Sequence, residues 1–179
     1  MSNLLGLGDP QAQFKVYLAN RPAFSFAHGQ SEIIALQQGE ITAVGQACAN
    51  GWRKVFNVYA KLMFALSGES TIAMQQNEFV DWQTYRDQRL LQQNSNTALL
   101  FSDYKSTLSQ NDVLHIVMGR TYAKSLHLPT SIQWLDKEFA VDLKHKLIVC
   151  PYFDYRQLSN IKIIRLVELI VQLQRNKGG

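Results

Sequence analysis

The chain has little cysteine, and its two cysteines lie far apart. No CxxC or Cys–His spacing surrounds either Cys48 or Cys150. Structural zinc sites and disulfide frameworks need such ligands in clusters at short spacings. The sequence therefore indicates neither a structural zinc site nor a disulfide framework. We expect a protein of a reducing compartment that holds no metal and no other cofactor.

Long apolar runs and targeting signals are also lacking. The first residues, MSNLLGLGDP, carry no basic residue and no apolar run of signal-peptide length. No segment approaches the roughly 18 consecutive apolar residues that a membrane-spanning helix needs. We therefore expect a soluble, cytoplasmic protein with no membrane partner. A single α/β domain should span residues 1–179, with residues 1–12 as a leader and residues 174–179 as a flexible tail.

Cofactor fingerprints are missing too. The segment LLGLGDP contains GxG, but it lacks the third glycine of a dinucleotide-binding loop and follows no strand pattern. Histidine is also scarce, and no histidine has a second metal ligand nearby in the sequence; the four are His28, His115, His127 and His145. Neither a bound dinucleotide nor a metal centre is therefore predicted.

Charge is low and unevenly spread. Charged residues make up 18% of the chain against 46% hydrophobic residues, which is typical of a globular protein. Residues 1–100 carry seven basic and seven acidic side chains, whereas residues 101–179 carry eleven basic and seven acidic ones. This excess is compatible with nucleic acid or another anionic partner, although many proteins of similar charge bind neither.

What the sequence does have is a series of short apolar segments alternating with amphipathic ones. This pattern predicts a three-layer α/β/α sandwich with a mostly parallel central sheet. The predicted strands are Phe14–Leu18, Asn96–Asp103, Val113–Met118, Phe139–Leu143 and Leu147–Cys150. The predicted helices are Glu32–Leu36, a piece after Gly39, Gly51–Leu66, Phe79–Gln92, Arg120–Leu126 and a terminal helix from Ser159 or Asn160 to Leu173.

Three loops follow predicted strands. They are ANRPAF after the first strand, GRTYAKSL after the third and CPYFDYRQLS after the last. In open α/β sheets, ligands bind where loops leave the carboxyl ends of the strands. We therefore expect the turns at Pro22 and Pro151 to lie at the same edge of the sheet and to border a candidate site.

These loops resemble motifs of the uracil-DNA glycosylase superfamily. Its first strand ends in Gly-Gln-Asp-Pro-Tyr-His or Gly-x-Asn-Pro-Gly, and its last strand ends in His-Pro-Ser followed by Leu-Ser. The corresponding runs are Ala19–Phe24 and Cys150–Tyr152 with Leu158-Ser159 downstream, and HIVMGRTYAKSL looks like the family's middle strand and its Gly-Arg/Lys-x-x-Ala segment. The resemblance extends from Phe14 to Leu173 and implies a uracil-DNA glycosylase-like fold, of bacterial type, with a pocket at this edge.

Two departures affect the chemistry that the resemblance implies. Arg21 stands where the family has the Asp or Asn that activates or positions water, and arginine has no acceptor for a proton. Cys150 stands where the family has the His that stabilises the departing base, and cysteine cannot become a cation. The expected activity therefore lacks classical uracil excision, and the expected partner is nucleic acid or a nucleotide.

The candidate ligand-binding side chains come from all three loops. Aromatic rings can stack on a base and arginines can hold phosphates. The candidates are Asn20, Arg21, Phe24, Phe26, Arg120, Cys150, Tyr152 and Arg156, with Phe153, Tyr155 and Lys124 as neighbours. Alternatively, the rings pack under the loops and the arginines pair with Asp103 and Asp154.

Two other functions stay open. The first is a homodimeric interaction module without catalysis, which an exposed patch built from Trp52, Trp82 or Trp134 would favour. The second is an enzyme of other chemistry that uses Cys150 or His28.

Overall fold

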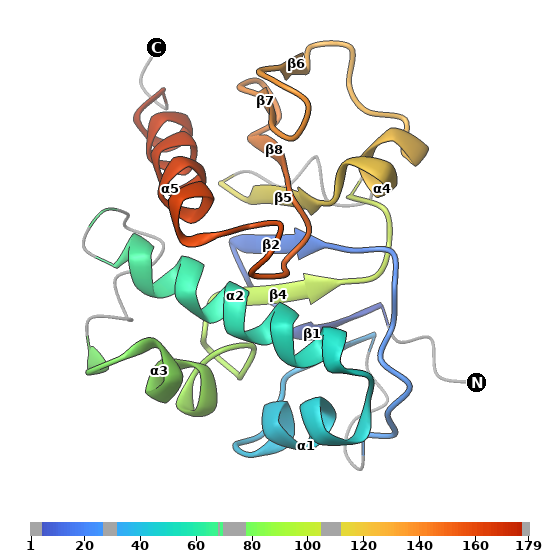
Figure 1. The fold of residues 1–179 in the computed structure, drawn as a ribbon, viewed down its shortest axis with the longest axis vertical. Helices are drawn as coiled ribbons and strands as arrows, with labels where there is room; N and C mark the ends of the chain where they lie inside the picture. The colour runs from blue at the N-terminus through green and yellow to red at the C-terminus, as the bar shows by residue number, and fades with distance from the viewer. Residues whose placement is uncertain (1–4, 27–31, 68, 70–77, 105–111, 177–179) are drawn as a thin grey trace.

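A computed structural model describes residues 5–26, 32–67, 69, 78–104 and 112–176. In these residues the chain forms a mixed α/β fold with one eight-stranded, mostly parallel sheet and five helices (Figure 1). The sheet order is β3-β1-β4-β2-β5-β8-β7-β6. The α/β class predicted from the alternating pattern is confirmed.

Four parallel strands form the centre of the sheet. They are β4 (Thr97–Leu100), β2 (Phe14–Tyr17), β5 (Leu114–Met118) and β8 (Leu147–Cys150), and every residue in them is buried. Burial on both faces explains why these segments are continuous apolar runs rather than alternating ones. Because the strands are parallel, the loops after them leave from one edge, as predicted.

The flanking strands are short and complete the sheet on both sides. On one side, β1 (Gly6–Gly8) runs antiparallel to β4 and pairs in parallel with β3 (Ile33–Ile34). On the other side, β7 (Ala140–Asp142) runs antiparallel to β8 and forms a hairpin with β6 (Gln133–Trp134). The sheet is therefore parallel at its centre and mixed at its margins.

The buried side chains form two clusters. Most of the core includes α1 (Glu40–Ala47), α2 (Asn50–Leu66), α3 (Trp82–Gln88) and α5 (Asn160–Arg175), together with strand residues such as Val16 and Ile116. Alternate strand residues, such as Tyr17 and Val117, join a smaller cluster with Ala123 of α4 (Arg120–Ser125). The period-two alternation of strand side chains produces this division.

Two predictions about the amino-terminal half are wrong. Residues 32–36 do not form a helix, since Ile33–Ile34 is strand β3. The leader expected over residues 1–12 contributes β1 to the sheet, and Leu7 is fully buried. Gly8 has a φ of +125°, and a Cβ atom there would lie 2.7 Å from the Cα of Ala98. The glycines that suggested a flexible leader instead allow a close strand pairing.

Three helix boundaries also differ. The helix predicted over Phe79–Gln92 is limited to Trp82–Gln88, because Asp81 caps its start by accepting a 2.7 Å hydrogen bond from the Thr84 amide. Helix α2 begins at Asn50, one residue before the predicted start at Gly51, and its N-cap residue, Ala49, supplies no side-chain hydrogen bond. Helix α5 continues to Arg175, past the predicted start of the tail at residue 174.

Candidate functional site

A groove of about 670 Å³ lies at the carboxyl edge of the sheet. Its walls come from the loops after β2, β5 and β8, from α4 and from the turn between β6 and β7. The described residues that line it are Ala19, Met118, Gly119, Arg120, Thr121, Tyr122, Ser125, Lys137, Glu138, Pro151, Tyr152 and Gln157. The volume is that of a site for a small molecule or a single nucleotide unit.

Two cations of the groove have no acidic partner in the part of the chain that the structure describes. Arg120 opens α4 and Lys137 lies in the β6–β7 turn, and both are exposed. Neither makes an ion pair with any residue that the structure describes. The carboxylate on the same groove, Glu138, is held by Lys162 at 2.8 and 2.9 Å. The groove therefore presents a net positive charge.

Tyr152 forms one side of the groove and connects two of the loops. Its ring faces Gly119, where an added Cβ atom would lie 3.8 Å from Cδ2 of the ring. Burial raises the pKa of its hydroxyl, and a hydrogen bond from the Asn20 side chain opposes that rise. This contact brings the loop after β2 beside the loop after β8, as the two proline-marked turns predicted.

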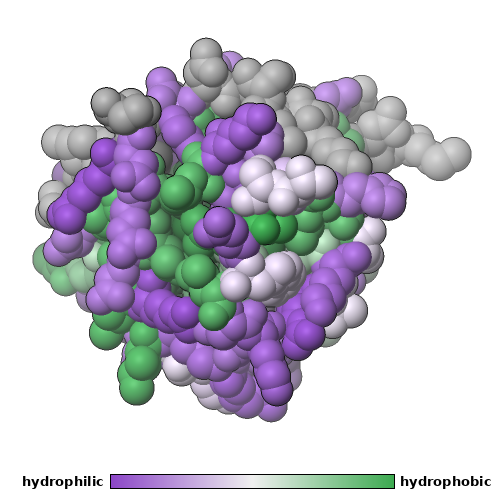
Figure 2. Space-filling model, turned by 90° about the horizontal axis from the view of Figure 1, so that it is seen from above, coloured by the Kyte–Doolittle hydropathy of each residue, from purple (hydrophilic) through white to green (hydrophobic). Residues whose placement is uncertain are grey.

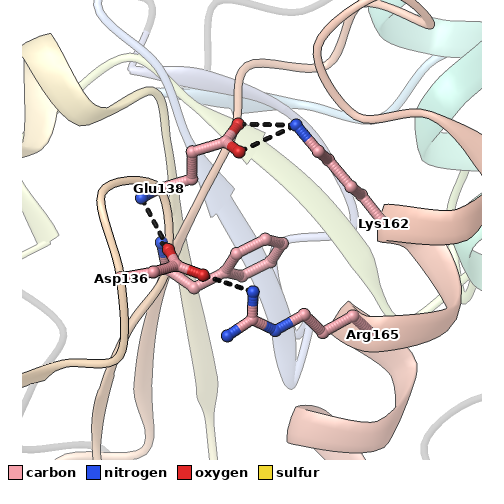
Figure 3. A network of polar contacts seen from close by, with 5 residues as sticks. Asp136, Glu138, Lys162 and Arg165 are labelled. Atoms are coloured by element: carbon pink, nitrogen blue, oxygen red, sulfur yellow. Dashed lines mark hydrogen bonds and ion pairs between the residues drawn. The ribbon is translucent and has the colours of Figure 1, made fainter.

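The β6–β7 turn is fixed to helix α5 by a network of polar contacts (Figure 3). Glu138 accepts hydrogen bonds from Lys162, and Asp136 pairs with Arg165, whose guanidinium lies 4.5 Å from the centre of the Phe139 ring. Asp136 also accepts hydrogen bonds from the backbone amides of residues 138 and 139, at 2.7 and 2.8 Å. These contacts hold Lys137 and Glu138 at the mouth of the groove.

The two substituted motif positions do not form a reactive pair. Arg21 is exposed, and Cys150 is fully buried in the core. Neither lines the groove. Burial raises the pKa of the Cys150 thiol far above its usual value, so the sulfur stays protonated at neutral pH. Cys150 therefore lies in the core rather than in the groove, and a protonated thiol is a poor nucleophile.

Phe24 and Phe26 pack together rather than line the groove. Their ring centres lie 4.8 Å apart, and both rings contact the main core while remaining partly exposed. Phe153 is fully buried and packs edge-on against Tyr59 at 5.7 Å. For these three rings the alternative interpretation, packing under the loops, is the one observed.

Arg156 is paired, also in agreement with the alternative. It donates from Nη2 to Asp154 at 3.1 Å, and its backbone amide donates to the same carboxylate at 2.9 Å. Lys54 of α2 reaches the carboxylate at 3.4 Å. These hydrogen bonds, from the Arg156 side chain first, lower the pKa of Asp154 to about 2. Asp154 thereby ties the loop after β8 to α2.

The sequence interpretation missed the part of the groove that comes from the β6–β7 turn. Lys137 and Glu138 follow no central strand, so the rule that places sites at carboxyl ends of parallel strands does not reach them. Gln157 also lines the groove; the loop that contains it, CPYFDYRQLS, was predicted to border the site, but Gln157 was not among the candidate residues. Of the predicted residues, Arg120 and Tyr152 line the groove, and Asn20 contacts Tyr152.

The histidines that the structure describes form no metal centre with one another or with other described ligands. His115 is buried and shares a 2.8 Å hydrogen bond with the Tyr17 hydroxyl through Nδ1. Burial, then the charges of Lys15 and His145, lowers its pKa to about 4. Among the described residues, no group of three or more His, Cys, Asp or Glu side chains is arranged to hold an ion. His28 lies outside the described residues.

The tryptophans do not form one surface patch. Trp52 is buried, and Trp82 lies under the cations of Lys61 and Arg86, at 5.1 and 5.5 Å from the ring centre. Trp134 is 37% exposed beside Lys124. Figure 2 shows the face that is uppermost in Figure 1, where hydrophobic side chains are interrupted by hydrophilic ones.

Comparison with known proteins assigns the chain to a family. A family profile matches residues 5–171, which include every strand that the structure describes and most of α5. The chain belongs to DUF6942, a family of unknown function. No curated protein and no solved structure matches this DUF6942 chain. Within the described residues, no helix of this DUF6942 protein is long and apolar enough to cross a bilayer.

Proposed function

We propose that this protein binds nucleic acid or a nucleotide in the groove at the carboxyl edge of its sheet, on a glycosylase-like three-layer α/β/α fold, without classical uracil excision. The observation that carries the proposal is the groove itself, which combines two unneutralised cations, Arg120 and Lys137, with the ring of Tyr152. Cations hold phosphate groups and an aromatic ring offers a stacking surface for a base.

The arrangement of the sheet supports the fold part of the proposal. Four parallel strands stand at the centre, and the loops after β2, β5 and β8 border one groove. Buried clusters on the two faces include four helices on one face and α4 on the other. In the proposed fold, the antiparallel strand β1 and the hairpin of β6 and β7 are additions at the margins of the parallel sheet.

The chemistry of the edge supports binding rather than excision. The exposed guanidinium of Arg21 has no acceptor that could take a proton from water. The thiol of Cys150 is buried and neutral, so it cannot stabilise charge on a departing base. The same protonated thiol argues against an enzyme that uses Cys150 as a nucleophile.

The test combines an excision assay with binding of single-stranded oligonucleotides at several salt concentrations. We expect no release of base from uracil- or mismatch-containing DNA. We expect binding that weakens with salt, and a double variant, Arg120→Gln with Lys137→Gln, should bind at least about tenfold more weakly. Its log–log salt slope should fall by roughly one to two, because each phosphate contact contributes about 0.7 for single strands.

A matched control separates the groove from overall charge. Lys144→Gln with Arg175→Gln removes one lysine and one arginine that are also exposed and have no ion-pair partner among the described residues. This control should keep the wild-type affinity. Equal weakening of both double variants would show that net charge, not the groove, attracts the ligand. Absence of salt-dependent binding in the wild type would overturn the proposal.

A further inference from the structure

A second cavity, of about 440 Å³, lies between helices α1, α2 and α3, away from the groove. The two cavities share no lining residue. Polar side chains from three helices surround this one, and they include Thr42 and Gln46 of α1 and Asn50 and Asn57 of α2. None of its described lining residues is acidic, while two, Arg53 and Arg86, are cationic.

Arg86 of α3 is held in place by three groups. Its Nη1 donates to Oδ1 of Asn57 at 2.7 Å, and its Nε and Nη2 donate to the Asp87 carboxylate at 2.7 and 3.1 Å. Its guanidinium also lies 5.5 Å from the centre of the Trp82 ring. A guanidinium has five N–H groups, so these contacts fix its plane and leave N–H groups for a ligand.

Arg53 supplies a second cation to this cavity. It is exposed, and it makes no ion pair with any described residue. The next residue, Lys54, forms an ion pair with Asp154. On α2 the residues Asn50, Arg53 and Asn57 are spaced three and four apart, which places them on one side of the helix. Arg53 therefore joins two amides and the fixed guanidinium of Arg86 around one cavity.

Gly45 keeps this cavity open. It lies inside helix α1, where glycine is less favourable than alanine by about 1 kcal/mol. An added Cβ atom would lie 3.6 Å from the Cβ of Arg53, an ordinary contact that requires no movement. Packing therefore permits a larger residue at this position. A larger side chain would instead fill the open space next to Arg53.

We propose that this cavity binds a small organic anion through its phosphate or carboxylate group, with Arg53 and Arg86 as the cationic contacts. Planar guanidinium groups match the paired oxygens of both anions, and the amides of Asn50, Asn57 and Gln46 offer further donors. The cavity is larger than one phosphate group, so the ligand carries additional polar atoms. The site is independent of nucleic-acid binding at the groove.

The first test measures anion binding to the full chain by calorimetry, with inorganic phosphate and succinate as probes at constant ionic strength. We expect the wild type to bind at least one of them, and Arg53→Gln should weaken that binding about tenfold or more. Arg175→Gln, an exposed arginine at the end of α5, is the matched control and should bind like the wild type. Phosphate preference identifies a phosphorylated ligand, and succinate preference identifies a carboxylate.

The second variant, Gly45→Leu, blocks the cavity without removing a charge. Because leucine favours helix and the Cβ atom fits, the melting temperature should not fall, yet anion binding should be lost. Circular dichroism melting and the same calorimetric titration measure both effects. The proposal is overturned if neither probe binds the wild type, if Arg53→Gln and Arg175→Gln weaken binding equally, or if folded Gly45→Leu binds normally.

Discussion

At the scale of single residues, Asp154 organises the loop after β8. Its side chain is 11% exposed and accepts hydrogen bonds from the amide and guanidinium of Arg156 as well as from Lys54. The charged form is favoured by these donors, which is why the pKa of Asp154 falls to about 2. Asp154, which the sequence suggested as a partner for an arginine, thus also connects the loop after β8 to helix α2.

We predict that Asp154→Asn lowers the free energy of unfolding by about 1 kcal/mol at pH 7, because a neutral amide pairs less strongly with Lys54 and Arg156. The folded-state pKa is depressed, so the wild type has this stabilisation above pH about 4 and loses it as the pH falls towards 2. Urea denaturation across this range should show the two proteins converging in acid.

The matched control is Glu78→Gln, which removes an exposed carboxylate that lies 3.4 Å from Arg89. Its effect at pH 7 should stay below about 0.5 kcal/mol. A constant difference between Asp154→Asn and the wild type at every pH would contradict the ionic origin of the stabilisation.

At the scale of secondary-structure elements, the attachment of the β6–β7 hairpin to α5 shapes the groove. The hairpin ends the sheet, and strand β6 is exposed. Two ion pairs, Lys162 with Glu138 and Arg165 with Asp136, join its turn to the helix (Figure 3). The same turn carries Lys137, one of the two unneutralised cations. The position of that cation therefore depends on α5.

We predict that Arg165→Ala destabilises the hairpin by about 1 kcal/mol, because it removes both the pair with Asp136 and the contact with the Phe139 ring. Hydrogen exchange should report this locally, as faster exchange of the amides of Leu135 and Phe139, which donate within the turn. Arg165→Lys keeps the positive charge but loses the planar guanidinium, so its exchange rates should lie between those of the wild type and of Arg165→Ala.

Lys144→Ala serves as the control, because Lys144 is exposed near the same hairpin and makes no ion pair with described residues. Its exchange rates should match those of the wild type. Unchanged exchange in Arg165→Ala would mean that the hairpin holds its position without α5.

At the scale of the whole molecule, the amino-terminal segment belongs to the core of the fold. Strand β1 stands between β3 and β4 and joins the start of the chain to residues near position 100. Only glycine allows the approach at position 8, where the φ is +125° and the neighbouring strand leaves no room for a Cβ atom. The stability of the sheet therefore depends on a short glycine-rich segment, Gly6–Gly8, whose one side chain beyond hydrogen, Leu7, is fully buried.

We predict that Gly8→Ala lowers the free energy of unfolding by at least about 2 kcal/mol, through backbone strain and the clash with Ala98. Gly51→Ala is the matched control. Gly51 lies in the first turn of α2 with open space around it, so alanine there should raise stability by up to about 1 kcal/mol. Chemical denaturation measures the stability of both variants. If Gly8→Ala and Gly51→Ala change the free energy of unfolding alike, the proposed role of β1 is refuted.

Self-association also belongs to this scale and stays a prediction. The exposed large apolar side chains include Leu135 and Leu143 near the hairpin and Ile161 and Ile164 on α5. Sedimentation at two protein concentrations decides between a homodimer and a monomer.

The sequence alone determined the central part of this fold. Four buried strands, the helix α2 and the helix α5 were predicted within a few residues, because each strand is a short apolar run and each helix has a hydrophobic period, and both signals depend only on the segment's own residues. The parallel order also followed from alternation of strands and helices, and with it the edge at which Arg120, Tyr152 and Asn20 meet.

Only the tertiary structure decided what depends on distant partners. Strand β1 is a strand because β4 pairs with it, and Lys137 lines the groove because α5 holds its turn. The cavity at Arg53 needs three helices to exist at all, and the burial of Cys150 depends on the core around it. Pairing, packing and charge neutralisation join residues far apart in the chain, and local periodicity carries no information about them.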